Sequence, residues 1–244
     1  MQGNSQQQAY DRGITIFSPD GRLYQVEYAR EAVSRGTASV GVRTPDGVVL
    51  GAVRRVRSPL MERSSVEKLH KADDHVGIAS AGHVADARQL IDFARRRAQT
   101  ERLRYDEAIP IETLTKSVTD HIQQYTQTGG ARPFGVALLV GGISDGEPRL
   151  FETDPSGTPY EWQATAVGGD REAIQSVLEE GYREDLDLDG GVDLALRGLA
   201  ATNDDLSADG VEIATIDAET ESFETVSTET VEEHLAEIGG ESDE

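Results

Sequence analysis

The pattern of apolar positions in the first half of the chain predicts a helix, three strands and a long second helix. Residues 23–33 have an apolar helical face, and residues 37–43 and 48–54 are strand-like runs joined by a Thr-Pro-Asp-Gly turn. A third strand is predicted at residues 75–80. The stretch 84–104 has apolar residues on one face and arginines on the other, which is typical of a helix packed on a sheet.

The second half of the chain repeats this grouping of strands and helices. A helix is predicted over residues 111–126, followed by Gly129-Gly130 as its terminator. Residues 134–142 and 149–153 predict a second strand pair, extended by residues 164–167. Helices at 171–183 and 192–202, a strand at 211–217 and a helix near 229–238 complete the pattern. Because strict β-α alternation is absent, we expect an α+β fold of two stacked antiparallel sheets with helices on both outer faces.

Composition favours one large domain. The 244 residues are 37% hydrophobic and 28% charged, and no Pro/Ser-rich linker divides them. Residues 1–9 are Gln-rich rather than basic and then apolar, and no apolar run approaches the roughly 18 residues of a membrane helix. We therefore expect a cytoplasmic protein with a flexible tail at 1–9, a domain at 10–238 and an acidic disordered tail at 239–244. The absence of cysteine excludes disulfides, thiolate metal sites and cysteine nucleophiles.

The charge balance is strongly acidic. The chain has 45 Asp and Glu against 23 Lys and Arg, a formal net charge of -22, and its only lysines are Lys68, Lys71 and Lys116. Nucleic acids and anionic membranes are therefore not expected as partners. An acidic, lysine-poor surface is typical of proteins from cells with molar internal salt, where a Debye length of about 3 Å screens repulsion between like charges. An acidic protein from ordinary salt is the alternative.

Several short motifs suggest a catalytic or metal-binding site, but the residues around them argue against it. Residues 142–146 match the nucleophile pattern Gly-x-Ser-x-Gly, which requires a strand-to-helix turn at Ser144. Because residues 148–151 are strand-like, we interpret the match as a hairpin loop. Residues 185–190 open like a calcium-binding loop, but Leu196 stands where a bidentate Glu is needed, so a solvated loop is expected.

Two further groups are candidates for ligand sites. His70 and His75 flank Asp73 and Asp74, but no helical His-Glu-x-x-His spacing supports a metal, and we expect these four to be exposed surface residues. The loop at residues 129–132 lacks the Gly-Lys-Ser/Thr sequence that binds phosphates. No cofactor or metal is predicted.

A long segment near the N-terminus is the most specific feature of the sequence. It contains Tyr10-Asp11-Arg12, the run Ile-Phe-Ser-Pro-Asp-Gly-Arg-Leu at 16–23, Gln-Val-Glu-Tyr-Ala at 25–29 and Arg-Gly-Thr at 35–37. This segment resembles the N-terminal signature of proteasome α subunits. The resemblance continues to about Gly169, through residues 66–69, 81–88, 124–126, 132–136 and 154–157.

The resemblance implies a fold and a role. The fold is the four-layer αββα sandwich of N-terminal-nucleophile hydrolases, which agrees with the predicted order of elements. The role is non-catalytic: seven copies form an outer ring that caps rings of β subunits, restricts access to the proteolytic chamber and docks a regulatory ATPase through the C-terminal tails of that ATPase.

Catalytic β subunits of the same superfamily provide the main alternative. They free a threonine by cleaving after a glycine and use its amine as base, beside a lysine and an acid. Gly36-Thr37 stands where this cleavage would fall, and Lys68 lies in a similar neighbourhood to the catalytic lysine. A self-processing N-terminal-threonine hydrolase is therefore the rival interpretation. Because the position of the acid falls on Val53 and cleavage would discard the signature, we interpret Thr37 as an ordinary strand residue.

The resemblance assigns residues to a gate at the N-terminus: Tyr10, Asp11, Arg12, Pro19 and Tyr28. A tyrosine hydroxyl and an aspartate can hold a tail in one of two hydrogen-bonded positions. The aromatic pair Tyr24 and Tyr28 would equally suit a half-buried helix.

Two further sites are implied in the same way. Lys68, between neighbouring subunits, is expected to receive the C-terminal carboxylate of activator tails, with Gly82 and His83 beside it. His83 stands where an apolar residue is expected. The loop that narrows the axial pore corresponds to Thr128, Gly129, Gly130, Ala131 and Arg132.

Overall fold

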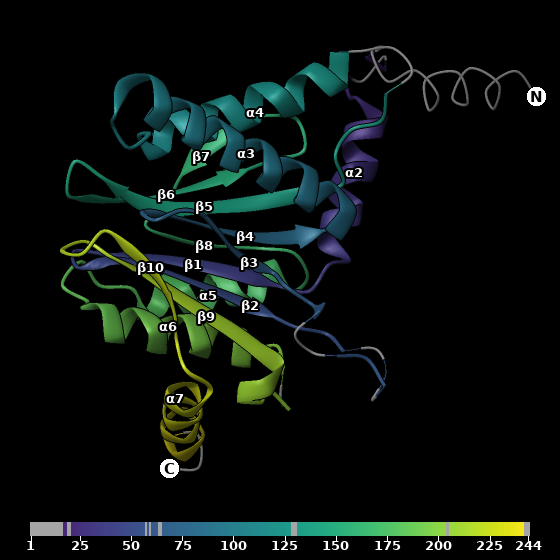
Figure 1. The fold of residues 1–244 in the computed structure, drawn as a ribbon. Coiled ribbons are helices and arrows are strands. Elements are labelled where there is room, and N and C mark those ends of the chain that lie inside the picture. Colours follow the sequence, from purple (N-terminus) through teal and green to yellow (C-terminus); the bar gives the residue numbers. More distant parts are fainter. Residues whose placement is uncertain are drawn as a thin grey trace, which may run out of the picture.

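The computed structural model describes residues 17–18, 21–56, 58, 60–62, 65–127, 131–203 and 205–241. In these residues two antiparallel sheets are stacked face to face, and helices cover the outer face of each sheet (Figure 1). The four-layer αββα sandwich expected from the sequence is thereby confirmed.

The first sheet has the strand order β10-β9-β2-β1-β8. Its strands are β1 (Ser39–Thr44), β2 (Gly47–Val53), β8 (Ala164–Val167), β9 (Val211–Asp217) and β10 (Ser222–Thr225). The predicted hairpin is β1–β2, with Ser39 opposite Ala52. Residues 164–167 pair with β1, so the prediction that they extend the other sheet was wrong. This short apolar run carries no signal for which sheet it joins, and β10 was not predicted.

The second sheet has the order β3-β4-β5-β6-β7. Its strands are β3 (Leu69–Asp73), β4 (Val76–Gly82), β5 (Val136–Ser144), β6 (Glu147–Thr153) and β7 (Pro159–Glu161). β3 was missed because its sequence, Leu-His-Lys-Ala-Asp, is largely polar. β5 and β6 are joined by the two-residue turn Asp145-Gly146, so the Gly-x-Ser-x-Gly match is the hairpin predicted for it.

Helices cover both sheets (Figure 1). α3 (Val84–Tyr105) and α4 (Ile111–Gln127) pack on the second sheet, whereas α5 (Arg171–Gly181) and α6 (Leu188–Ala200) pack on the first. α2 (Tyr24–Ser34) crosses one end of the sandwich and contacts β4 and β5. α7 (Thr228–Glu241) lies beyond α6 and includes the first three residues of the segment expected as a disordered tail.

Three buried clusters fill the spaces between the layers. One joins α3 and α4 to the second sheet, one joins the two sheets, and one joins the first sheet to α5 and α6. Their members include Leu90 and Ile111, Leu50 and Leu150, and Leu196, respectively, each with no exposed surface. Among the described residues, no helix has both the length and the apolar character needed to cross a membrane.

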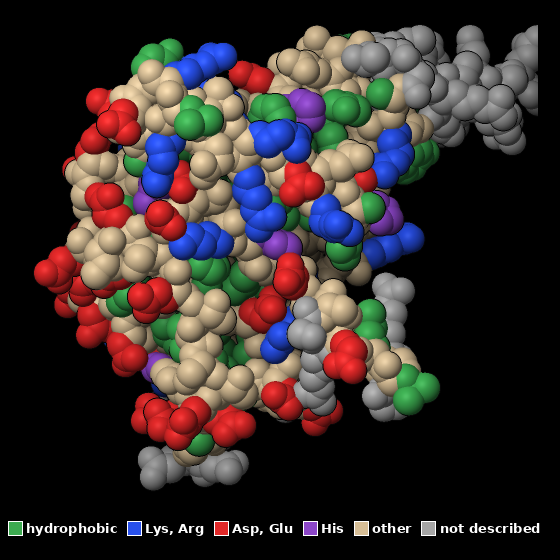
Figure 2. All heavy atoms as spheres, viewed as in Figure 1, with side chains coloured by type: hydrophobic (Ala, Val, Ile, Leu, Met, Phe, Trp, Pro, Cys, Tyr) green, Lys and Arg blue, Asp and Glu red, His purple; other side chains and the backbone are tan. Residues whose placement is uncertain are grey.

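Charge is distributed unevenly over the face drawn in Figure 2. Lysines and arginines gather over α3, whereas acidic side chains dominate over α7. The sequence explains this separation, because residues 202–244 contain no Lys or Arg at all.

Candidate functional site

Helix α2 carries the one predicted gate residue that the structure describes. Val26, Ala29 and Val33 form its buried face, while the Tyr28 ring is 52% exposed on the other side. The remaining gate residues, Tyr10, Asp11, Arg12 and Pro19, lie outside the described residues. The structure therefore places Tyr28 on a firmly packed helix, with about half of the residue's surface exposed.

A cavity of about 440 Å³ brings together one residue from each of the three predicted sites. Tyr28 comes from α2, His83 from the residue before α3, and Arg132 from the segment before β5. Gln25, Ala29, Ala32, Ala85, Asp86, Pro133 and Gly135 complete the lining. Among the described residues, this cavity is therefore where a residue of the predicted gate, one of the tail pocket and one of the pore loop lie together.

The segment at residues 131–135 is irregular, and α3 holds it in place. The guanidinium of Arg132 donates to both carboxylate oxygens of Asp86 at 2.6 Å, and the Gly135 N–H donates to Asp86 Oδ2 at 2.8 Å. The His83 N–H donates to the Gly135 carbonyl, also at 2.8 Å. Thr128, Gly129 and Gly130 of the predicted pore loop lie outside the described residues, so only Ala131 and Arg132 are seen.

Asp86 was not among the predicted site residues. Its position in the first turn of a long helix would ordinarily be explained by the helix dipole, which favours an acid there. Its pairing with Arg132 would have identified Asp86 more clearly as a site residue, but the two residues are 46 positions apart in the sequence. Sequence spacing alone does not show such a contact.

Lys68 is buried, whereas a residue that docks a partner on an open surface would be exposed. It is 8% exposed, and its ammonium donates to the carbonyl oxygen of Thr37 at 2.7 Å and to the Thr37 hydroxyl at 2.8 Å. Burial lowers the pKa of Lys68 to about 8, and the nearby carboxylate of Glu212 opposes this shift. Lys68 is therefore still mostly charged at neutral pH but is poised to lose its proton in mildly alkaline solution.

The three residues of the predicted tail pocket do not all face one space. Gly36 packs directly on Gly82, since a Cβ atom on Gly36 would lie 2.5 Å from the Gly82 nitrogen, and this brings Gly82 close to the Thr37–Lys68 pair. Gly82 has φ +118°, and a side chain there would meet the Gly135 carbonyl. His83, which is exposed, lines the cavity beside Tyr28 instead.

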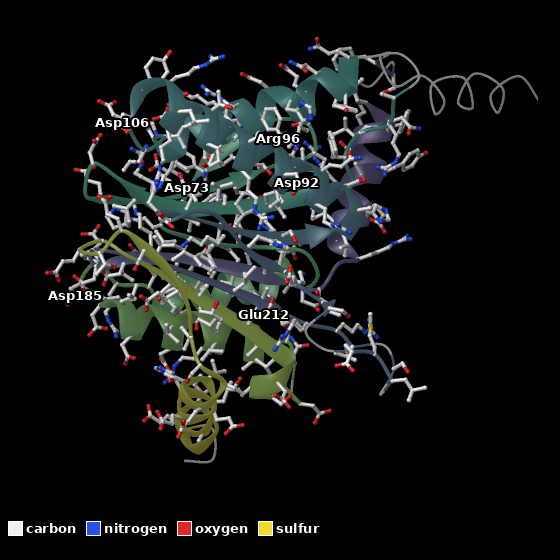
Figure 3. All side chains as sticks on the ribbon, in the orientation of Figure 1. Asp73, Asp92, Arg96, Asp106, Asp185 and Glu212 are labelled. Carbon is white, nitrogen blue, oxygen red and sulfur yellow. The ribbon has the colours of Figure 1, made fainter. Side chains whose placement is uncertain are left out.

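The Thr37–Lys68 pair has part of the geometry of a nucleophile and its base. A second cavity, of about 670 Å³, opens beside Thr37, but Val53 lines it where a carboxylate would be needed. Glu212, on β9 (Figure 3), accepts from the backbone N–H of Lys68 at 3.0 Å and pairs with Arg54. The amine of Thr37 is also bound in the peptide bond to Gly36. In the intact chain the self-base of a threonine hydrolase is therefore absent.

The weaker motifs have structural explanations. The Ser144 hydroxyl accepts from the Ile111 N–H at 2.9 Å at the start of α4, and Asp187 accepts from the Gly190 N–H at 2.8 Å as the N-cap of α6. Both are helix-capping arrangements, which satisfy backbone donors that have no partner within the helix. A cap explains why α6 begins at Leu188, four residues before the predicted start.

The expectation that His70, Asp73, Asp74 and His75 are exposed surface residues holds only for Asp74. The His70 side chain is 10% exposed, and Asp73 and His75 are 6% and 3% exposed. The turn that carries them is covered by Arg102 at the end of α3, 3.3 Å from Asp73, and by Ile109, whose carbonyl is 2.9 Å from His75 Nε2. Among the described residues, no group of His, Asp and Glu has the arrangement of a metal site.

Comparison with known proteins agrees with the fold. The family described as "Proteasome subunit" matches residues 33–216, and the N-terminal signature of A-type proteasome subunits matches residues 10–32. The chain belongs to the proteasome subunit family and is one of the α subunits of the core particle, as its sequence resemblance predicted. Membership of this core complex implies that it assembles with other proteasome subunits.

Similar α subunits come from halophilic archaea. The chain is 74% identical over 238 residues to the proteasome alpha 1 subunit of Haloarcula marismortui, covering 97% of this chain and 92% of the relative. It is 72% identical over 244 residues to the proteasome alpha 2 subunit of the same organism, covering 99% and 100%. Identity to the proteasome alpha subunit of Natronomonas pharaonis is 72% over 239 residues, covering 97% and 94%. These relatives agree with the salt-adapted surface predicted from the acidic, lysine-poor composition.

Proposed function

We propose that this chain is a non-catalytic gating subunit of the 20S proteasome core, acting in the cytoplasm in intracellular protein degradation. Seven subunits form each outer ring, which controls passage to the β subunits and docks a regulatory ATPase. The observation that carries the non-catalytic role is the packing of α2 immediately before Thr37. Val26, Ala29 and Val33 of this helix are buried, so cleavage at Gly36-Thr37 would remove part of the folded core.

The backbone at the cleavage position is also fixed. The Gly36 carbonyl accepts from the Gly169 N–H at 2.8 Å, and the Gly36 N–H donates to the Val33 carbonyl at 2.9 Å. These bonds join the end of α2 to the residues that follow β8. They support a chain that keeps its N-terminal segment after assembly.

A self-processing threonine hydrolase is the second candidate, favoured by one observation. The 2.8 Å contact between Lys68 Nζ and Thr37 Oγ1 is within the range expected of a nucleophile and its base. Against it stand the apolar Val53 and the engagement of Glu212 with the Lys68 backbone and with Arg54. The Lys68 side chain also does not replace the free amine that an N-terminal threonine would supply.

The gate is proposed to use Tyr28 together with Tyr10, Asp11, Arg12 and Pro19. The exposure of Tyr28 on a packed helix supports this role, because a tyrosine hydroxyl can hold a tail in one of two hydrogen-bonded positions. Its location beside Arg132 supports a gate that adjoins the axial pore loop.

Docking of the ATPase is proposed at Lys68, Gly82 and His83. A tail carboxylate would form a charge-assisted hydrogen bond with the Lys68 ammonium. The ammonium has three N–H donors and gives two of them to Thr37, so docking can use the third. The bonds to Thr37 would then hold the ammonium in place while the tail carboxylate binds.

Mass spectrometry of the assembled core tests the first candidate against the second. We expect the chain to retain its N-terminal segment, Met1 or a lightly trimmed form. A mature chain that begins at Thr37 would establish the hydrolase instead. Deletion of residues 1–12 tests the gate separately, because it should speed peptide hydrolysis by the assembled core, and an unchanged rate would contradict the gating role.

A further inference from the structure

Asp86 makes an unusual set of contacts for an acid in the first turn of a helix. One oxygen accepts from Arg132 Nη2, and the other accepts from both Arg132 Nη1 and the Gly135 N–H. A carboxylate that receives a bidentate guanidinium and a backbone amide fixes both groups in direction as well as distance. Asp86 thus connects the rigid start of α3 to two points of the irregular segment before β5.

The two partners of this ion pair differ sharply in exposure. The Asp86 side chain is 6% exposed, whereas the Arg132 side chain is 65% exposed. Burial alone would raise the pKa of Asp86, but the Arg132 guanidinium and the Gly135 N–H outweigh it and hold the pKa below its usual value. The carboxylate therefore remains charged and acts as a fixed anchor, while the arginine is the part that reaches toward the surface.

The loop between α4 and β5 has a second anchor on its other side. Tyr125, in the last turns of α4, contacts the Phe134 ring edge-on with ring centres 4.7 Å apart. Phe134 is buried, so this contact ties the end of α4 to the segment that Asp86 holds. Side chains outside residues 128–130 therefore hold both the end of α4 and Arg132 in place.

We propose that Asp86 is a positioning residue for the axial pore, because it holds the Arg132 guanidinium in one orientation just before β5. The inference rests on the proposed function, in which Arg132 is one of the residues that narrow the pore. The effect of Asp86 is exerted through Arg132.

The variant D86N tests the proposal in assembled cores that lack residues 1–12, so that the gate does not limit passage. Asn can still accept from the Gly135 N–H but loses the charged bidentate pairing. We expect the rate of hydrolysis of an unfolded protein such as casein, relative to that of a short fluorogenic peptide, to rise by about fivefold, equivalent to about 1 kcal/mol. R132Q should give the same change, and it should fold normally because Arg132 is largely exposed.

The matched control is E152Q. Glu152 is a buried carboxylate that pairs with both guanidinium nitrogens of the half-exposed Arg171, at 2.6 and 2.7 Å, away from the pore-loop segment. E152Q should leave the casein-to-peptide ratio unchanged. Because Asp86 acts through Arg132, the double variant D86N/R132Q should match either single variant rather than add to it.

The possible results separate this inference from the proposed function. A casein-to-peptide ratio in D86N and R132Q equal to that of E152Q would overturn the positioning role, even where deletion of residues 1–12 opens the gate. Additive effects of D86N and R132Q would also overturn it, since they would mean independent actions. Deletion of residues 1–12 without any acceleration would instead reject the gate, whatever the two variants show.

Discussion

The ammonium of Lys68 lies 2.8 Å from the hydroxyl oxygen of Thr37, at the point where α2 leads into the first sheet. The same ammonium donates to the Thr37 carbonyl at 2.7 Å. A buried cation with two oxygen partners from one residue holds the backbone at the strand entrance. In the proposed non-catalytic subunit, the contact that would activate a nucleophile in a threonine hydrolase serves as a structural bond between neighbouring elements.

The first prediction removes the hydroxyl from this contact. T37V keeps the shape of the side chain and the carbonyl acceptor, but Lys68 loses one partner, which should lower the free energy of unfolding by about 1–2 kcal/mol. Denaturant titration of the purified chain in molar KCl measures this loss. Peptide hydrolysis by the assembled core should not change, and a core inactivated by T37V would show that Thr37 is catalytic.

S39A provides a control for the same prediction. The Ser39 hydroxyl donates to the Ser80 carbonyl at 2.9 Å, a buried contact without a charged partner. Because hydrogen bonds to charged groups contribute more than neutral ones, S39A should destabilise the chain less than T37V does. An equal loss in both variants would indicate that the charge on Lys68 adds nothing to the Thr37 contact.

The second prediction concerns pH. Burial lowers the pKa of Lys68 from 10.5 to about 8 in the folded chain. Below pH 8 the lysine is charged in both states, and the folded chain bears the cost of its burial. Between pH 8 and 10.5 the unfolded chain binds more protons at Lys68 than the folded chain does, so the contribution of Lys68 to the free energy of unfolding rises with pH, by about 3 kcal/mol in all.

K68M isolates this effect. The stability of the wild-type chain relative to K68M should increase between pH 8 and pH 10, measured by denaturant titration in molar KCl. K71M is the comparison variant, because Lys71 is about half exposed and pairs with Asp74 at the surface. A constant difference between wild type and K68M across this range would refute the lowered pKa.

The sequence predicted the layers of the fold because each depends on local periodicity. Residues 87–98 form an apolar face of α3 that packs on the sheet, and residues 136–143 form a continuous buried run. The sequence did not predict the partner sheet of residues 164–167, since a run of four residues suits either sheet. Pairing is decided by contacts with β1, which lies over 120 positions earlier in the chain.

Only those site residues that lie in a segment resembling the family could be predicted from the sequence. Lys68 and Arg132 stood in segments that resemble the family, but the resemblance did not show that Lys68 faces Thr37 or that Arg132 is held by Asp86. Both contacts are made between elements distant in sequence. They depend on how α2, α3 and the two sheets meet at one end of the sandwich, which local patterns do not encode.

The third prediction separates a helix cap from a calcium site in the acidic loop before α6. Asp187 accepts from the Gly190 N–H at 2.8 Å, so D187A should lower the free energy of unfolding by about 1 kcal/mol through loss of the cap. D187S, which keeps a capping oxygen, should recover most of this stability. Calcium or EDTA should leave the unfolding midpoint of the wild-type chain unchanged, and a calcium-dependent shift would restore the metal interpretation.

The fourth prediction concerns the row of like charges on α7. Glu229, Glu233 and Glu237 are exposed and four residues apart, so neighbouring carboxylates lie on one face of the helix. Like charges at this spacing destabilise a helix by about 0.2–0.5 kcal/mol per pair when they are not screened. At about 0.1 M salt the Debye length is about 10 Å and the repulsion acts, whereas at 1 M it is about 3 Å and the repulsion is largely lost.

E233K converts both repulsive pairs of this row into attractive ones, and Glu229 stands on the favoured N-terminal side of the new lysine. The variant should therefore raise the free energy of unfolding by about 1–2 kcal/mol at 0.1 M KCl and by much less at molar KCl. E233Q, which removes the charge without creating a pair, should give a smaller gain at low salt. Denaturant titration of wild type, E233K and E233Q at both salt concentrations measures these changes in the free energy of unfolding. An equal gain in stability from E233K at low and high salt would mean that the gain is not electrostatic. Repulsion on the acidic face of α7 would then not explain a dependence of stability on salt.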